Sequence, residues 1–279
     1  MVDNRGGGDR RPGRPNRDGA PQRGNRGQPP SRSGPDRARR TQPSRPGEGG
    51  ADSRDNHSGP PAPPIPPTVD AKQLAPDVRR ELSTLDKTTA DTIARHLVAA
   101  GDLLEEDPEA ALEHARAARQ RSGRIAAIRE AVGIAAYRCG DWAQALSELR
   151  AARRMGAKSE LLPLIADCER GVGRPERAIE LARTPEAEAL TGDEADELRI
   201  VVAGARADLG QLEQSLAVLA SPPLDPKRSG QTAARLFYAY AEALLALDRT
   251  EEALQWFFHA ASADVENVTD AEDRISELA

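Results

Sequence analysis

The chain has 279 residues, enough for one or two ordinary domains, but its composition changes sharply near residue 69. Residues 1–69 hold 13 Arg, no Lys and 7 acidic residues, a net charge of +6, whereas the other 26 basic and 38 acidic residues give −12. The sequence opens without the apolar segment of a secretory signal and has no run of about 18 apolar residues, so we expect a cytoplasmic location and no membrane partner.

The first segment, residues 1–69, has little apolar surface to bury. It contains 14 of the 22 Pro and 12 of the 23 Gly, and it has no aromatic residue. Collapse therefore cannot offset a backbone entropy cost of roughly 1–2 kcal/mol per residue, and we predict a disordered arm. Its proline run at residues 60–67 favours a stiff polyproline II spacer, with a ligand for an SH3-like domain as the alternative.

The arm is rich in Arg-Gly sequence of the kind found in disordered RNA-binding tails, which bind phosphates. It lacks aromatic residues for base stacking, and Arg outnumbers Lys 35 to 4 in the whole chain, as codon bias in a GC-rich genome would produce. A solubilising linker and an arm that folds back on the acidic body therefore stay open. The candidate nucleic-acid contacts are Arg23, Arg26, Arg37, Arg39 and Arg40.

Helices are predicted from residue 74 onward. A lead helix is expected over 74–85 and a longer one over 87–104. Asp107 and Pro108 predict the start of a third helix, because Asp can accept from the free amides of the first turn and Pro lacks the N–H that would stay unpaired there.

A spaced pair of small residues recurs along the rest of the chain and predicts helical hairpins. One member lies in each second helix and the other stands twelve residues earlier, with successive copies 33 to 38 residues apart. Small side chains at both places let paired helices approach closely. Tight turns are expected at Gly140, Gly173, Gly210 and Asp248. The pairs are Ala99 and Ala111, Gly133 and Ala145, Ala166 and Ala178, Ala203 and Ser215, and Ala241 and Ala253.

This pattern resembles the tetratricopeptide repeat (TPR) over about residues 88–264, most specifically at 132–152, where Gly133 and the Gly140-Asp141-Trp142 turn stand. The resemblance implies an all-α, TPR-like solenoid of helical hairpins wound as a right-handed superhelix. We expect it to span residues 70–279, with about five hairpins, or four and a degenerate one, plus a lead helix. A C-terminal capping helix, with a capping box that begins at Thr269, would close it.

No catalytic constellation accompanies the repeats. The four His residues are scattered, and the sequence lacks a P-loop, an HExxH motif and a GxSxG motif, so we expect no enzyme activity and no cofactor. Cys139 and Cys168 are predicted to be buried and reduced rather than zinc ligands. Trp142 is predicted to be structural, and the aromatic residues of the last hairpin form either core or a partner-binding patch.

The TPR resemblance also implies a groove lined by the first helix of each hairpin. Its mixture of residues leans acidic and suits a basic or mixed peptide, so the predicted function is a non-catalytic protein–protein interaction scaffold. An RNA- or ribosome-associated factor that uses the arm is the alternative, and the oligomeric state is not predicted. The groove candidates are His96, Glu130, Ile134, Tyr137, Glu160, Asp167, Glu197, Arg235, Tyr238 and Glu242.

Overall fold

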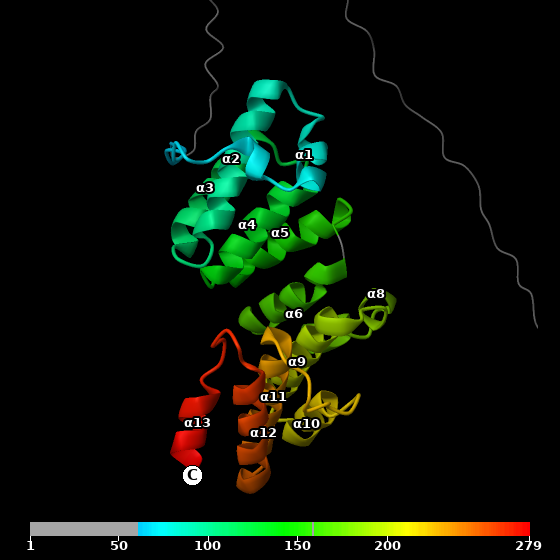
Figure 1. The fold of residues 1–279 in the computed structure, drawn as a ribbon. Helices are drawn as coiled ribbons and strands as arrows, with labels where there is room; N and C mark the ends of the chain where they lie inside the picture. Colours follow the sequence, from blue (N-terminus) through cyan, green and yellow to red (C-terminus); the bar gives the residue numbers. More distant parts are fainter. Residues whose placement is uncertain (1–60, 158) are drawn as a thin grey trace, which may run out of the picture. The chain divides into compact units, whose positions relative to one another are not determined.

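The computed structural model describes residues 61–157 and 159–279, and these residues form helices and connecting segments without any strand (Figure 1). The predictions for residues 1–60, including the five arginines of the arm, lie outside them. Two short 3-10 helices are Ala71–Gln73 and Ser159–Leu161. The α-helices are α1 (Pro76–Leu82), α2 (Lys87–Leu103), α3 (Pro108–Arg121), α4 (Ala126–Arg138), α5 (Trp142–Arg154), α6 (Leu162–Gly171), α7 (Pro175–Leu181), α8 (Pro185–Glu188), α9 (Gly192–Asp208), α10 (Leu212–Leu219), α11 (Gln231–Leu245), α12 (Thr250–Ala263) and α13 (Ala271–Leu278).

The predicted lead helix over 74–85 is wrong in its bounds. The 3-10 helix at Ala71–Gln73 comes first, and α1 begins only at Pro76. Ala75 adopts a ψ of 141° because the ring of Pro76 disfavours a helical conformation at the residue before it. The start of α3 is confirmed, since Asp107 accepts from the Ala110 amide at 3.0 Å.

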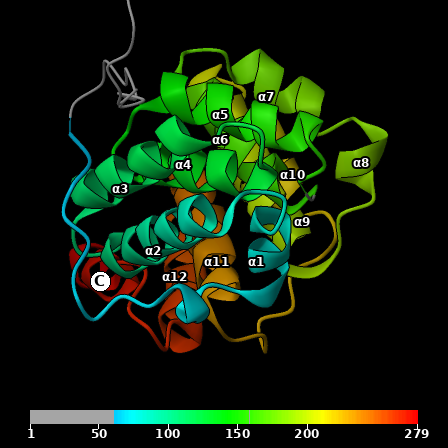
Figure 2. The same cartoon turned by 90° about the horizontal axis from the view of Figure 1, so that it is seen from above.

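Consecutive helices pack in pairs, namely α2 with α3, α4 with α5, α6 with α7, α9 with α10 and α11 with α12. Each pair also contacts the next along the chain, and α13 packs on α12. Apolar residues of α3, α4, α5 and α6 share one buried cluster, and those of α11 and α12 share another with α13. The sequence did not predict α8, a short helix between α7 and α9 (Figures 1 and 2).

The small residues lie where paired helices meet, and all ten are buried. The hydroxyl of Ser215 donates to the carbonyl of Ala203 at 2.8 Å and so joins two positions twelve residues apart. A Cβ added to Gly133 would stand 2.6 Å from Cγ of Leu149 on the partner helix. The predicted role of these residues in close helix packing is therefore confirmed.

Four of the hairpin turns share one backbone motif. Gly140, Gly173, Gly210 and Asp248 have φ angles of 72°, 75°, 71° and 59°. In each turn the next residue donates its N–H to the carbonyl five residues earlier, at 2.8 to 3.1 Å. These bonds satisfy carbonyls at the end of the first helix, as a left-handed C-terminal cap does. The predicted turns are thus confirmed at their positions.

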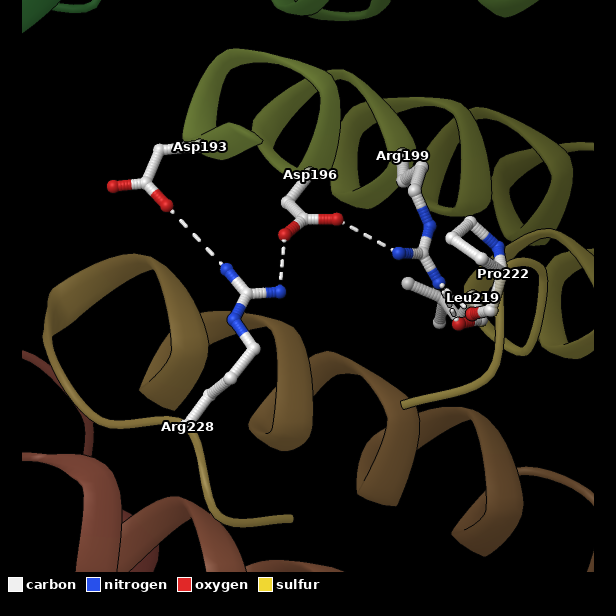
Figure 3. A network of polar contacts seen from close by, with 6 residues as sticks. All are labelled: Asp193, Asp196, Arg199, Leu219, Pro222 and Arg228. Carbon is white, nitrogen blue, oxygen red and sulfur yellow. Dashed lines mark hydrogen bonds and ion pairs between the residues drawn. The ribbon is translucent and has the colours of Figure 1, made fainter. Parts of the chain in front are cut away.

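The long connection between α10 and α11 is held to α9 by a charged network (Figure 3). Asp196 is buried and accepts from Arg199 at 2.7 Å and from Arg228 of the connection at 2.6 Å. Arg199 also donates to the carbonyl of Leu219, at the end of α10, and to that of Pro222 at 2.9 Å. The network fixes a segment that carries no helix of its own.

The predicted capping box at Thr269 is wrong. Asp270 occupies the N-cap position of α13 and makes no side-chain capping bond. The hydroxyl of Thr269 instead donates to Oδ2 of Asp264 at 2.7 Å, and the same carboxylate accepts from the amides of Val268 and Thr269. Asp264 therefore engages the hydroxyl that would have capped the helix.

Candidate functional site

Two groove candidates join neighbouring helix pairs to each other. The hydroxyl of Tyr137 on α4 donates to Oδ2 of Asp167 on α6 at 2.7 Å, and burial together with this carboxylate raises the pKa of Tyr137 well above its ordinary value. Arg170 donates to Oδ1 of Asp167 at 2.8 Å and also reaches Asp208 at the end of α9. Asp167 is thus already paired within the fold.

The candidates farther along the chain are paired in the same way. Arg235 on α11 donates to Glu197 on α9 at 3.0 Å, and Arg274 on α13 donates to Glu242 on α11 at 2.9 Å. Burial raises the pKa of the Glu197 carboxyl, while Arg235 acts in the opposite direction. These residues connect successive helices, so a partner would have to compete with ion pairs that already exist.

His96 does not face a groove, because its side chain is buried and only 2% exposed. Its Nδ1 lies 3.0 Å from Nδ1 of His114 on α3, a contact in which one ring donates and the other accepts. Burial lowers the pKa of His96 to about 4, and it lowers the pKa of His114 as well. Both rings are therefore neutral near pH 7 and belong to the α2–α3 contact.

The remaining candidates from the first part of the fold, Glu130, Ile134 and Glu160, line one cavity of about 890 Å³. One wall of this cavity comes from α1, another from α4, and a third from residues 155–157, 160 and 161. We call it the acidic cleft and define it by six of its residues. They are Asp77, Glu81, Glu130, Ile134, Met155 and Glu160.

Negative charge predominates in the acidic cleft. Its described lining carries four carboxylates and one guanidinium, that of Arg124. Oε2 of Glu81 accepts from the Ala127 amide at 3.3 Å, in the first turn of α4, where the N-cap residue Ile125 makes no side-chain bond. A carboxylate at this end of a helix interacts favourably with the helix dipole. The same bond ties the α1 wall to the α4 wall.

The acidic cleft also presents apolar surface between its carboxylates. Val78, Leu97, Ile134 and Leu161 contribute to its lining. Met155, on α5's C-terminal side, is 38% exposed, which makes it one of the more exposed large apolar side chains of the described chain. A Met side chain adapts its shape to different apolar partners. The cleft can therefore contact both charged and apolar groups of a ligand.

Sequence reasoning missed the contribution of Asp77 and Glu81, because α1 was interpreted as a lead helix outside the repeats. The available signal is helical spacing. Residues 77, 78 and 81 share one face of α1, and residues 127, 130, 131 and 134 share one face of α4. The sequence shows each face but not that the two faces meet.

Arg235 and Tyr238 lie apart from the acidic cleft, on a second cavity of about 640 Å³ that Asp270 and Asp273 also line. The aromatic residues of the last hairpin divide between core and surface. Phe237 and Phe257 are fully buried, whereas Phe258 is 52% exposed. Core packing therefore accounts for part of that cluster only.

Both cysteines are unbonded thiols. Cys168 is buried, as predicted, and burial raises its pKa to about 12, but Cys139 is only partly buried.

Trp142 packs on the next helix pair, since a Cβ on Gly171 would stand 2.5 Å from its ring. Among the residues that the structure describes, no three His, Cys, Asp or Glu side chains are placed to hold a metal ion.

Comparison with known proteins adds no relative. Neither a protein-family model nor a curated protein matches the sequence significantly. The likeness to the TPR family therefore rests on the residues and spacings of this chain.

Within residues 61–157 and 159–279, no helix combines the length and apolar character needed to cross a bilayer.

Proposed function

We propose that the helical part of the chain is a TPR-like scaffold that binds a protein partner at the acidic cleft and catalyses no reaction. The observation that carries the proposal is the cleft itself, a cavity of about 890 Å³ that several helices build together and that offers both carboxylates and apolar surface. Ligand sites in proteins are typically concave, with apolar lining and a few polar groups.

Repetition within the fold supports the scaffold half of the proposal. Five helix pairs pack in chain order, small residues recur where the helices of each pair meet, and four turns share one motif. A right-handed solenoid of stacked hairpins would have all these features. Repeat folds of this kind use extended surfaces to bind other chains.

Site-specific photo-crosslinking in living cells tests the proposal. A photoreactive amino acid replaces Thr84, an exposed residue of the cleft lining, and in a control variant it replaces Ala220, an exposed residue after α10. We expect one reproducible crosslinked protein from Thr84 that is missing from Ala220. Equal or absent crosslinking at the two positions would contradict the proposal.

The arginine content of residues 1–69 supports a second proposal, association with RNA or the ribosome through the arm. Such binding should weaken steeply as salt rises, because it depends on counterion release. Replacement of the five candidate arginines by Gln in the full chain should weaken retention on RNA and reduce its dependence on salt. Unchanged retention would exclude a role for those residues.

A further inference from the structure

We propose that a smaller cavity between α1 and α2, here called the α1–α2 cavity, binds an aliphatic carboxylate of the fatty-acid type. The site is separate from the acidic cleft and goes beyond the function proposed for it. The proposal follows from the apolar lining of this cavity and from the charges beside it.

The α1–α2 cavity has a volume of about 370 Å³, which lies in the range of about 300–1,000 Å³ typical of small-molecule sites. Leu82 and Ala94 in its lining are only 2% and 3% exposed and belong to a buried apolar cluster. The cavity therefore offers a hydrocarbon chain a surface continuous with the core. The apolar lining residues are Ala71, Leu82, Leu85, Ala90 and Ala94.

Two cations line the α1–α2 cavity without a carboxylate partner. Arg79 of α1 and Lys87 of α2 make no ion pair and no side-chain hydrogen bond with another of the described residues. Asp91, the carboxylate of the described lining, is engaged by Nε of Arg95 at 3.1 Å. The lining thus carries two positive groups against one negative group, and a single negative charge on a ligand balances the excess.

Helix α1 separates this cavity from the acidic cleft. Asp77 and Glu81 line the acidic cleft, whereas Arg79 and Leu82 line the α1–α2 cavity. Residues three or four apart share a helix face, so the two sets lie on different sides of α1. An anionic ligand is therefore attracted to one side of this helix and repelled from the other.

The lining disfavours simpler or more highly charged ligands. An inorganic anion would leave the apolar surface unused, and a neutral hydrocarbon would leave Arg79 and Lys87 without a partner. A phosphate head group carries a charge of about −1.5 to −2, which exceeds the excess charge of the lining and would be repelled by Asp91. A carboxylate carries a single charge and can accept two parallel bonds from a guanidinium.

Isothermal titration calorimetry of the full chain tests the proposal, with decanoate as the probe. Acetate supplies the head group without the chain, decanol supplies the chain without the charge, and decyl phosphate replaces the carboxylate by a phosphate. We expect decanoate to bind as one molecule per chain, and each comparison compound to bind at least about tenfold more weakly.

Variants of the native chain place the site. Arg79→Gln/Lys87→Gln should weaken decanoate binding about tenfold, because it removes both cations from the lining. The matched control is Arg154→Gln/Lys227→Gln, which removes an exposed Arg and an exposed Lys elsewhere and should leave binding unchanged. Ala90→Leu keeps both cations but fills part of the cavity, so it should also weaken binding.

The proposal is overturned if decanoate binds no more tightly than acetate, decanol or decyl phosphate. It is also overturned if the two double variants weaken binding equally, since that would indicate general attraction to cations. The comparison of compounds uses the native chain, so it tests the proposal even if a variant fails to fold. Crosslinking at Thr84 tests the acidic cleft separately.

Discussion

At the scale of single residues, the fold depends on side chains that are small. Gly133 faces Leu149 so closely that a Cβ would stand 2.6 Å from Cγ and 3.2 Å from the backbone nitrogen of that residue. The contact is between helices of one pair, α4 and α5. The size of a single side chain therefore limits how closely these two helices approach.

A Gly133→Ala variant should unfold more easily, with the free energy of unfolding lowered by about 1–3 kcal/mol, because an added methyl overpacks the α4–α5 contact. Gly101→Ala is the matched control. Nothing lies within 4 Å of a Cβ at that position of α2, and the better helix propensity of Ala should raise the free energy of unfolding by about 0.5–1 kcal/mol. Urea denaturation measures both changes, and equal changes of the same sign would contradict the account.

The buried pair of His96 and His114 predicts a pH dependence of stability. The pKa of His96 is about 4 in the folded chain against an ordinary value of 6.5, so between these values the unfolded chain binds the proton more strongly. The free energy of unfolding should therefore be highest above pH 6.5 and should fall, by up to about 3 kcal/mol, as pH drops toward 4.

Urea denaturation at about pH 7 and about pH 5 tests this dependence. Both pH values lie above the ordinary pKa of Asp and Glu. His96→Asn replaces the ring by an amide that does not titrate, so the variant should lose less stability between the two pH values than the native chain. An equal loss in both proteins would show that another group is responsible.

At the scale of helices and turns, much of the structure could be predicted from the sequence. The turns at Gly140, Gly173 and Gly210 need a left-handed backbone conformation that glycine adopts readily, so local sequence marks them. The start of α8 carries a local signal as well, because Thr184 accepts from the Ala187 amide at 3.4 Å and Pro185 stands in the first turn. The pairing of Thr269 with Asp264 depends instead on the path of the segment after α12, which helix-start patterns do not describe.

The connection between α10 and α11 illustrates a tertiary constraint of this kind. The Pro-rich sequence predicts an irregular segment, but not that Arg228 would reach Asp196 on α9 (Figure 3). Asp196 also accepts from Arg199. Its carboxylate is therefore shared by two guanidinium groups, one from its own helix and one from the connection.

Asp196→Asn should lower the free energy of unfolding by about 3 kcal/mol, since it removes the charge between two guanidinium groups at a side chain only 9% exposed. Asp193→Asn is the matched control, because Asp193 contacts the same Arg228 at 3.4 Å but is 69% exposed. Its effect should stay below about 1 kcal/mol. Thermal and urea denaturation of the two variants compare them, and similar losses would contradict a dominant role for the buried carboxylate.

At the scale of the whole described chain, the candidate site arises where separate elements meet. The sequence analysis singled out Glu130, Ile134 and Glu160 from the first helices of hairpins, and these three do line one cavity. It did not bring in α1, whose Asp77 and Glu81 complete the acidic lining, because no periodicity indicates which helix a lead helix will cover. Asp167 and Glu197, which the sequence placed in the groove, are each paired with a side chain of a neighbouring helix.

Hydrogen–deuterium exchange of the full chain, with and without the partner protein crosslinked at Thr84, tests most directly whether the acidic cleft is the binding site. We expect slower exchange in α1, in the first turns of α4 and in residues 155–157, 160 and 161, with unchanged exchange in α9 and α11. Protection centred on α9 and α11, or a partner that binds without protecting α1 and α4, would contradict this expectation.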